Sequence, residues 1–144
     1  AILAHANGSI MSVNGSYLHR LDPDNLSIQA ERELPADCSH NGLLALSDGT
    51  LITKDLRLVG QGGTTITRLD PDSLELIGQP LQLPEGSMGR IAADTIADAA
   101  GGLIDHVYVP GTEHLWRLVV DGDDLSIDEW RPRYRTANDR FGLS

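Results

Sequence analysis

The stretch RLDPDNL at residues 20–26 returns almost unchanged as RLDPDSL at residues 68–74, 48 positions further along the chain. A third and more divergent copy, RLVVDGDDL, occupies residues 117–125 and begins 49 positions after the second. A fixed period in this range is typical of repeat proteins, in which each unit is one supersecondary element that packs on its neighbours. We therefore expect three copies of one structural unit.

Each unit can be written as short β-prone runs separated by Gly, Asn, Asp and Pro, which is a hairpin pattern. The expected strands of the first unit are residues 1–6, 9–13, 17–21 and 27–34, and those of the second are 42–46, 50–55, 64–69 and 74–83. Those of the third are 90–94, 106–109, 115–120 and 125–131. The alanine-rich residues 92–100 are compatible with a short surface helix, since alanine favours helices.

The repeated Asp-Pro-Asp turns have a local physical explanation. Proline sets φ for the second position of a type I turn, and the preceding Asp accepts a hydrogen bond from the backbone N–H two residues on. We expect the leucine that follows each turn to re-enter the core at the same place in every unit: Leu26, Leu74 and Leu125.

Units of four short antiparallel strands, together with the LDPDSLEL stretch at residues 69–76, resemble the blades of quinoprotein-like and YVTN-type β-propellers. The resemblance covers nearly the whole chain and identifies the blade, not one protein. It implies an all-β fold with blades at residues 1–35, 36–84 and 85–135, and the first strand of a further blade at 136–144. Three four-stranded antiparallel blades plus one strand cannot close a ring, and would leave exposed sheet edges. We therefore expect further blades, from a longer protein or from another copy of the chain, to complete the propeller.

The charge of the chain limits its partners. It carries 11 Lys and Arg against 21 Asp and Glu, a formal net charge of −10. Nucleic acids and anionic membranes attract basic surfaces, so we expect neither as a partner, and a small molecule or a protein as the ligand. No apolar run reaches the roughly 20 residues that span a bilayer. We expect a soluble protein, and the sequence leaves a cytoplasmic and an exported location both open.

Polar residues gather in the loops that would lead from the outer strand of one blade to the inner strand of the next. In propellers these loops open onto the ligand-bearing face near the channel. The loops are residues 36–41, 85–89 and 136–140, and the candidate ligand-binding residues in or beside them are His40, Asn41, Arg90, Asn138 and Arg140. They vary between units while the turns are retained, as expected of a site carried on a scaffold.

The chemistry of these candidates leaves alternatives open. His40 can act as acid, base or metal ligand, or can simply hydrogen-bond the backbone at the start of a strand. Arg90 and Arg140 suit a carboxylate or phosphate, being planar and bidentate, or an ion pair between blades.

Metal and cofactor motifs are weak. The Asp-rich turns at residues 22–25, 70–72 and 121–124 supply the oxygen atoms that Ca²⁺ prefers, but a hairpin turn accounts for them more simply. No histidine spacing predicts a zinc site, and no phosphate-binding loop or nucleophile elbow is present. The sequence therefore predicts no metal site and leaves the cofactor unknown.

Two functions remain open beside a third, an assembly subunit whose exposed sheet edges pair with another chain by strand addition. The first is a ligand- or protein-binding propeller segment that uses the loop face near the central channel. The second, implied by the resemblance, is part of a propeller enzyme (lactonase-like hydrolase, arylsulfotransferase-like or quinoprotein-like) with its site in the same loops. Convergence of His40, Asn41 and Arg140 would favour an enzyme, and side chains engaged in ion pairs between blades would favour a scaffold.

Overall fold

The computed structural model describes residues 1–35 and 38–132, which form twelve strands and no helix. The predicted all-β class with four-stranded antiparallel units is confirmed. Sheet 1 consists of β1 (Ile2–Ala4), β2 (Ile10–Asn14), β3 (Tyr17–Leu21) and β4 (Ile28–Glu33). Sheet 2 consists of β5 (His40–Ala45), β6 (Leu51–Asp55), β7 (Thr65–Leu69) and β8 (Leu81–Gln82). Sheet 3 consists of β9 (Ala92–Ala97), β10 (Leu103–Pro110), β11 (His114–Asp121) and β12 (Asp124–Pro132).

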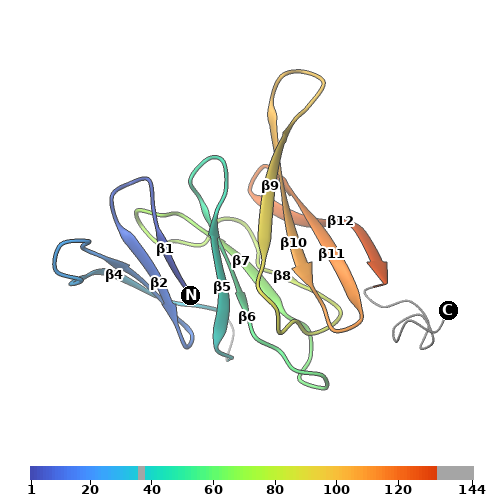
Figure 1. Cartoon of the computed structure of the whole chain (residues 1–144), viewed down its shortest axis with the longest axis horizontal. Helices are drawn as coiled ribbons and strands as arrows, with labels where there is room; N and C mark the ends of the chain where they lie inside the picture. Colours follow the sequence, from blue (N-terminus) through green and yellow to red (C-terminus); the bar gives the residue numbers. More distant parts are fainter. Residues whose placement is uncertain (36–37, 133–144) are drawn as a thin grey trace, which may run out of the picture.

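Every sheet is an antiparallel meander whose strands follow chain order. The three sheets follow one another across the molecule, from blue through green to orange in Figure 1. Sheet 2 therefore lies between two neighbours, and all five residues of its strand β6 are buried. In β2 of sheet 1 only Met11 and Val13 are buried, because only one face of that sheet has a neighbour among the described residues.

Two hydrophobic clusters hold the sheets together. One lies between sheets 1 and 2 and contains Met11, Val13, Leu18, Leu34, Leu51, Leu69 and Leu74. The other lies between sheets 2 and 3 and contains Leu46, Ile52, Ile66, Leu83, Val107, Val109, Trp116, Leu118 and Leu125. Each inner strand contributes alternate side chains to a cluster, as the pleat of a β-strand requires.

The two Asp-Pro-Asp turns adopt one conformation. Asp24 N donates to Asp22 Oδ1 at 2.8 Å, and Asp72 N donates to Asp70 Oδ1 at 2.9 Å, which confirms the predicted role of the first aspartate. Each turn closes with a bond from the leucine N–H to the carbonyl of that aspartate, at 2.8 Å for Leu26 and 2.9 Å for Leu74. Both leucines have a φ of 60°, a left-handed conformation that is unfavourable for leucine. The prediction that each leucine enters the core holds for Leu74 and Leu125 but is wrong for Leu26, which is exposed.

The short helix that we allowed for at residues 92–100 is not formed. Residues 92–97 are strand β9, which pairs along its whole length with β10. A hairpin turn follows, in which Asp98 Oδ1 accepts hydrogen bonds from Ala100 N and Gly102 N. The backbone bonds of this ladder outweigh the modest helix preference of alanine, which is at most several tenths of a kcal/mol per residue over typical residues.

The expected strand over residues 74–83 is also largely wrong. Only β8 and an isolated bridge between Leu69 and Leu76 remain. Pro80 cannot donate a ladder hydrogen bond, and Gly78 has a positive φ of 66°, so residues 78–80 are not part of a strand. The expected further strand at residues 136–144 lies outside the described residues. No helix within the described part of the chain is long and apolar enough to cross a membrane.

Candidate functional site

A cleft of about 540 Å³ opens between the start of β5, the N-terminal end of the chain and the segment that leads from sheet 2 to sheet 3. It is lined by Ala1, Ile2, His40, Asn41, Gly42, Leu43, Met88, Gly89, Arg90 and Ile91. Three of the five candidate residues, His40, Asn41 and Arg90, are thus brought to one cleft, two from the start of β5 and one from the segment between β8 and β9. The other two, Asn138 and Arg140, lie outside the described residues.

His40 occupies the first position of β5, where the ladder with β6 is irregular between His40 and Gly42. Its backbone N–H donates to Gly15 O at 2.8 Å, and its Nδ1 lies 3.3 Å from the same oxygen. Only 5% of the residue is exposed, and its Nε2 is buried without a hydrogen-bond partner. Burial lowers the pKa of His40 below its ordinary value, and the bond to Gly15 only partly offsets this effect. A neutral ring that donates from Nδ1 presents Nε2 as an acceptor.

Asn41 joins the two sides of the cleft. Its Nδ2 donates to Met88 O at 2.8 Å, and its Oδ1 accepts from Lys54 Nζ at 2.5 Å. Both ends of the amide are therefore used within the protein. Asn41 fixes the segment 88–91 against β5, and through it the position of Arg90.

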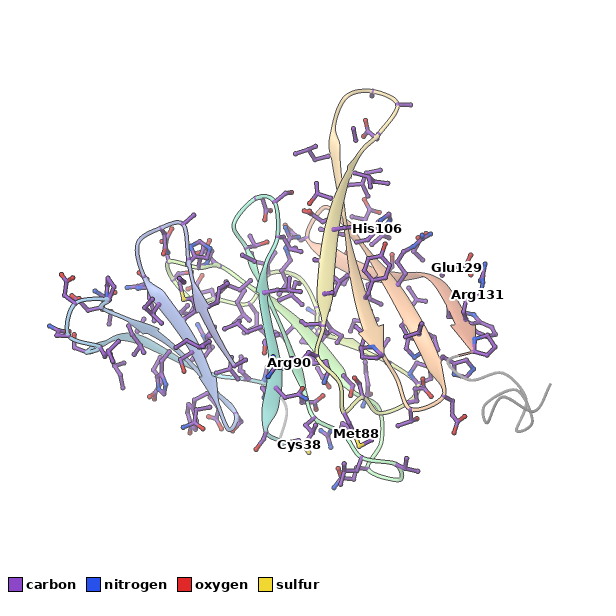
Figure 2. The ribbon with its side chains drawn as sticks, viewed as in Figure 1. Cys38, Met88, Arg90, His106, Glu129 and Arg131 are labelled. Atoms are coloured by element: carbon purple, nitrogen blue, oxygen red, sulfur yellow. The ribbon has the colours of Figure 1, made fainter. Side chains whose placement is uncertain are left out.

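Arg90 is an exposed cationic side chain of the cleft. Figure 2 shows it beside β5, and its side chain makes no hydrogen bond or ion pair with any residue of 1–35 or 38–132. An ion pair with Glu85, which would be one form of the expected ion pair between blades, is not formed. Glu85 instead accepts hydrogen bonds from sheet 3, including one of 2.7 Å from Trp116 Nε1. Partial burial raises the pKa of Glu85, but the bonds from Trp116, Glu113, His114 and Thr112 outweigh burial and lower it.

Lys54 lies directly behind Asn41 and was not foreseen from the sequence. It is fully buried, and its Nζ donates to Asn41 Oδ1, to Asp55 O at 3.0 Å and to Ser87 O at 3.2 Å. These three acceptors satisfy all three donors of an ammonium group. Burial lowers the pKa of Lys54 to about 8. The available signal was a lysine in a strand that begins with Leu51 and Ile52 and pairs on both sides, since buried lysines are rare and require partners.

Neighbouring polar groups complete the support of the cleft. Asp55, also fully buried, accepts from Arg57 Nε and from Thr65 N, both at 2.8 Å. Ser87 Oγ donates to Pro110 O at 2.7 Å, which ties the linking segment to sheet 3. These bonds tie the residues behind the cleft to both sheets, and Arg90 is left as its exposed side chain without a partner among the described residues.

The Asp-rich turns do not form a cation site in the described residues, which hold no group of three His, Cys, Asp or Glu suited to a metal ion. Asp70 Oδ1 is occupied by the N–H groups of Asp72 and Ser73, and these bonds lower the pKa of Asp70.

Comparison of the chain with protein-family models, with curated proteins and with solved structures gives no match.

Proposed function

We propose that the chain is a β-propeller segment that binds a small acidic ligand in the cleft formed by His40, Asn41 and Arg90. The observation that carries the proposal is the convergence of these residues from the start of β5 and from the segment between β8 and β9, with Arg90 unpaired within the described residues. The propeller assignment is supported by three consecutive four-stranded antiparallel sheets that follow one another in chain order.

The charges at the cleft favour an acidic group on the ligand. Arg90 is exposed and free to make a bidentate contact with a carboxylate or phosphate. Lys54 adds a second positive charge behind Asn41 at pH values below about 8. The chain as a whole carries a net charge of −10, and its negative potential repels anions. An anion is therefore attracted only where local cations such as Arg90 and Lys54 outweigh that potential.

The alternative function is catalysis by the same residues, as part of a propeller enzyme such as a lactonase-like hydrolase, an arylsulfotransferase-like or a quinoprotein-like protein. The observation that favours it is the position of His40 in the lining of the cleft, with a lowered pKa and an unpartnered Nε2 that is buried and that a substrate reaches only if the ring turns. A neutral imidazole can accept a proton from a bound hydroxyl group or water and so act as a general base. In this case Arg90 holds the acidic group of the substrate.

The test is calorimetric titration of the intact chain with inorganic phosphate, succinate and citrate. Binding to the wild-type chain and a loss of about tenfold or more in affinity in Arg90→Ala are expected, since one charge-assisted contact contributes about 1.5–3 kcal/mol. Arg20→Ala is the matched control, because it removes one positive charge in sheet 1, outside the cleft. Equal affinity in the two variants, or no binding of any of the three anions, would contradict the proposal.

A further inference from the structure

On the outer faces of sheets 1 and 3, hydrophobic residues occupy the positions that are equivalent to those by which the sheets pack on one another inside the molecule. The register of the strands makes the positions comparable: Ile10 pairs with Leu21 in sheet 1, and Leu51 pairs with Leu69 in sheet 2. Together with the leucine of the turn, these residues form one set in each sheet. In sheets 2 and 3 the set faces the sheet before it in chain order, and in sheet 1 it faces outward. The sets are Ile10, Leu21 and Leu26 in sheet 1; Leu51, Leu69 and Leu74 in sheet 2; and Val107, Leu118 and Leu125 in sheet 3.

Burial of these sets depends on whether a preceding sheet is present. Leu51, Leu69 and Leu74 are fully buried against sheet 1, and the set of sheet 3 is buried against sheet 2. Leu26 is 62% exposed, although it has the backbone conformation of Leu74. The other exposed large hydrophobic residues of sheet 1, which are Ile2, Tyr17 and Ile28, lie on the same outer face by the alternation of their strands.

Sheet 3 presents the opposite half of such a contact. Leu18 and Ile66 are buried because a following sheet packs on them. The register assigns the matching place in sheet 3 to Leu115, which is 49% exposed. Leu115 lines a shallow groove of about 310 Å³ together with Tyr108, Trp116, Arg117, Glu129, Trp130 and Arg131.

An arginine also contacts the following sheet from sheet 1, and sheet 3 has an arginine at the equivalent position. Arg32 pairs with Leu18 in sheet 1 and donates from Nε to Leu74 O in the turn of sheet 2, at 2.8 Å. Arg131 pairs with Leu115 in sheet 3 and so holds the place of Arg32. Its side chain is exposed, and its contacts are to Glu129 and Trp130 beside it on β12. Figure 2 shows Arg131 and Glu129 at the outer edge of the molecule.

We propose that a second copy of this chain docks head to tail, its sheet 1 packing on the outer face of sheet 3. Leu26 of one copy inserts beside Leu115 and Tyr108 of the other, as Leu74 packs beside Leu18 and Met11 within one chain. Arg131 then donates to the carbonyl of Leu26, as Arg32 donates to that of Leu74. The second copy is the occupant because the chain itself carries both halves of a contact that it already makes twice internally. Such a contact is heterologous, and it closes when the rotation between copies permits.

The direct test is disulfide cross-linking in a Cys38→Ser background. A chain with Leu26→Cys is mixed with a chain with Leu115→Cys under mild oxidation, and a cross-linked pair is expected. Neither variant should cross-link to itself. In a head-to-tail contact the introduced thiol on sheet 1 faces sheet 3 of the other copy, and in a single variant only one of these two sheets carries a thiol. Val59→Cys mixed with Leu115→Cys is the control, since Val59 is exposed in the loop between β6 and β7.

Two results would overturn the proposal. One is a yield for the Leu26 and Leu115 pair no greater than that of the Val59 control. The other is preferential self-cross-linking of Leu26→Cys, which indicates an isologous contact in place of a head-to-tail one.

A second measurement does not depend on introduced thiols. Analytical ultracentrifugation should show that Leu26→Asp weakens self-association by about 10- to 100-fold, the effect of removing one buried leucine. Val59→Asp should leave self-association unchanged, and circular dichroism checks that both variants are folded. Equal association of the two variants would overturn the proposal.

Discussion

The turns at residues 22–26 and 70–74 have nearly the same sequence and share the hydrogen bonds to their first aspartate from the residue two positions on and from the leucine, yet one leucine is exposed and the other is buried. Leu26 and Leu74 share a φ of 60°, but only Leu74 is buried. The conformation of the turn is therefore set locally, by proline and by the aspartate that accepts its backbone N–H groups. Burial is set by the neighbouring sheet, which Leu74 has within the chain and Leu26 does not.

The largest expected effect comes from shortening the two leucines separately. Leu74→Ala should lower the free energy of unfolding by about 2–5 kcal/mol, because it leaves a cavity between sheets 1 and 2. Leu26→Ala should cost less than about 1 kcal/mol when the protein is dilute enough to be monomeric. Urea unfolding at matched low concentration measures both. Similar losses in the two variants would show that the turn itself, and not the neighbouring sheet, determines the contribution of the leucine.

A second comparison is between Val13 in sheet 1 and Lys54 in sheet 2. The two residues occupy equivalent positions in the strand register, since Val13 pairs with Leu18 and Lys54 pairs with Ile66. The folded protein holds the pKa of Lys54 at about 8, below the 10.5 of the free side chain. Between these values the unfolded chain binds more protons than the folded one, so stability rises with pH across that window.

Lys54→Met should remove this pH dependence. The free energy of unfolding of the wild-type chain is expected to rise relative to the variant by up to about 3 kcal/mol between pH 8 and pH 10.5. Denaturant unfolding at several pH values measures it, and Val13→Met, which introduces the same side chain in sheet 1, is the control. Parallel pH profiles for wild type and Lys54→Met would contradict the assignment of a lowered lysine pKa.

The smallest of the three effects concerns Gly78, which lies 48 positions after Ala30 in the repeat. Gly78 has a φ of 66°, and a Cβ there would lie 2.2 Å from Asp123 O in the hairpin of sheet 3. Gly101 has a φ of 84° with no atom within 4 Å of such a Cβ. Gly78→Ala should therefore destabilise the protein by about 1–3 kcal/mol more than Gly101→Ala, because overpacking adds to the backbone strain. Equal melting temperatures for the two variants would contradict the close approach of sheet 3.

Much of the local structure was predictable, because it depends on neighbours in sequence. The aspartate bonds of the turns and most strands follow from proline, glycine and alternation. The failures occur where contacts between distant segments decide. The ladder with β10 makes residues 92–97 a strand despite their alanines, and the approach of sheet 3 to Gly78 accompanies the loss of a strand there.

The candidate site shows the same division. Repeat position indicated the loops that hold His40, Asn41 and Arg90, and the structure brings these three to one cleft. Lys54 was missed, because its acceptors Asn41 and Ser87 belong to two other segments of the chain. That Arg90 has no partner within residues 1–35 and 38–132 could not be predicted either, since it depends on Glu85 being engaged by sheet 3.

In the proposed assembly, the exposed outer face of sheet 1 becomes buried when it packs on sheet 3 of a second copy. The most direct test of this packing is the molar mass of the intact chain in solution, measured by light scattering over a range of concentrations. The chain has a mass of 15.5 kDa, and docking of two copies through sheets 1 and 3 predicts twice that value as concentration rises. A mass that stays at 15.5 kDa at every concentration, with Leu26 exposed, would contradict it.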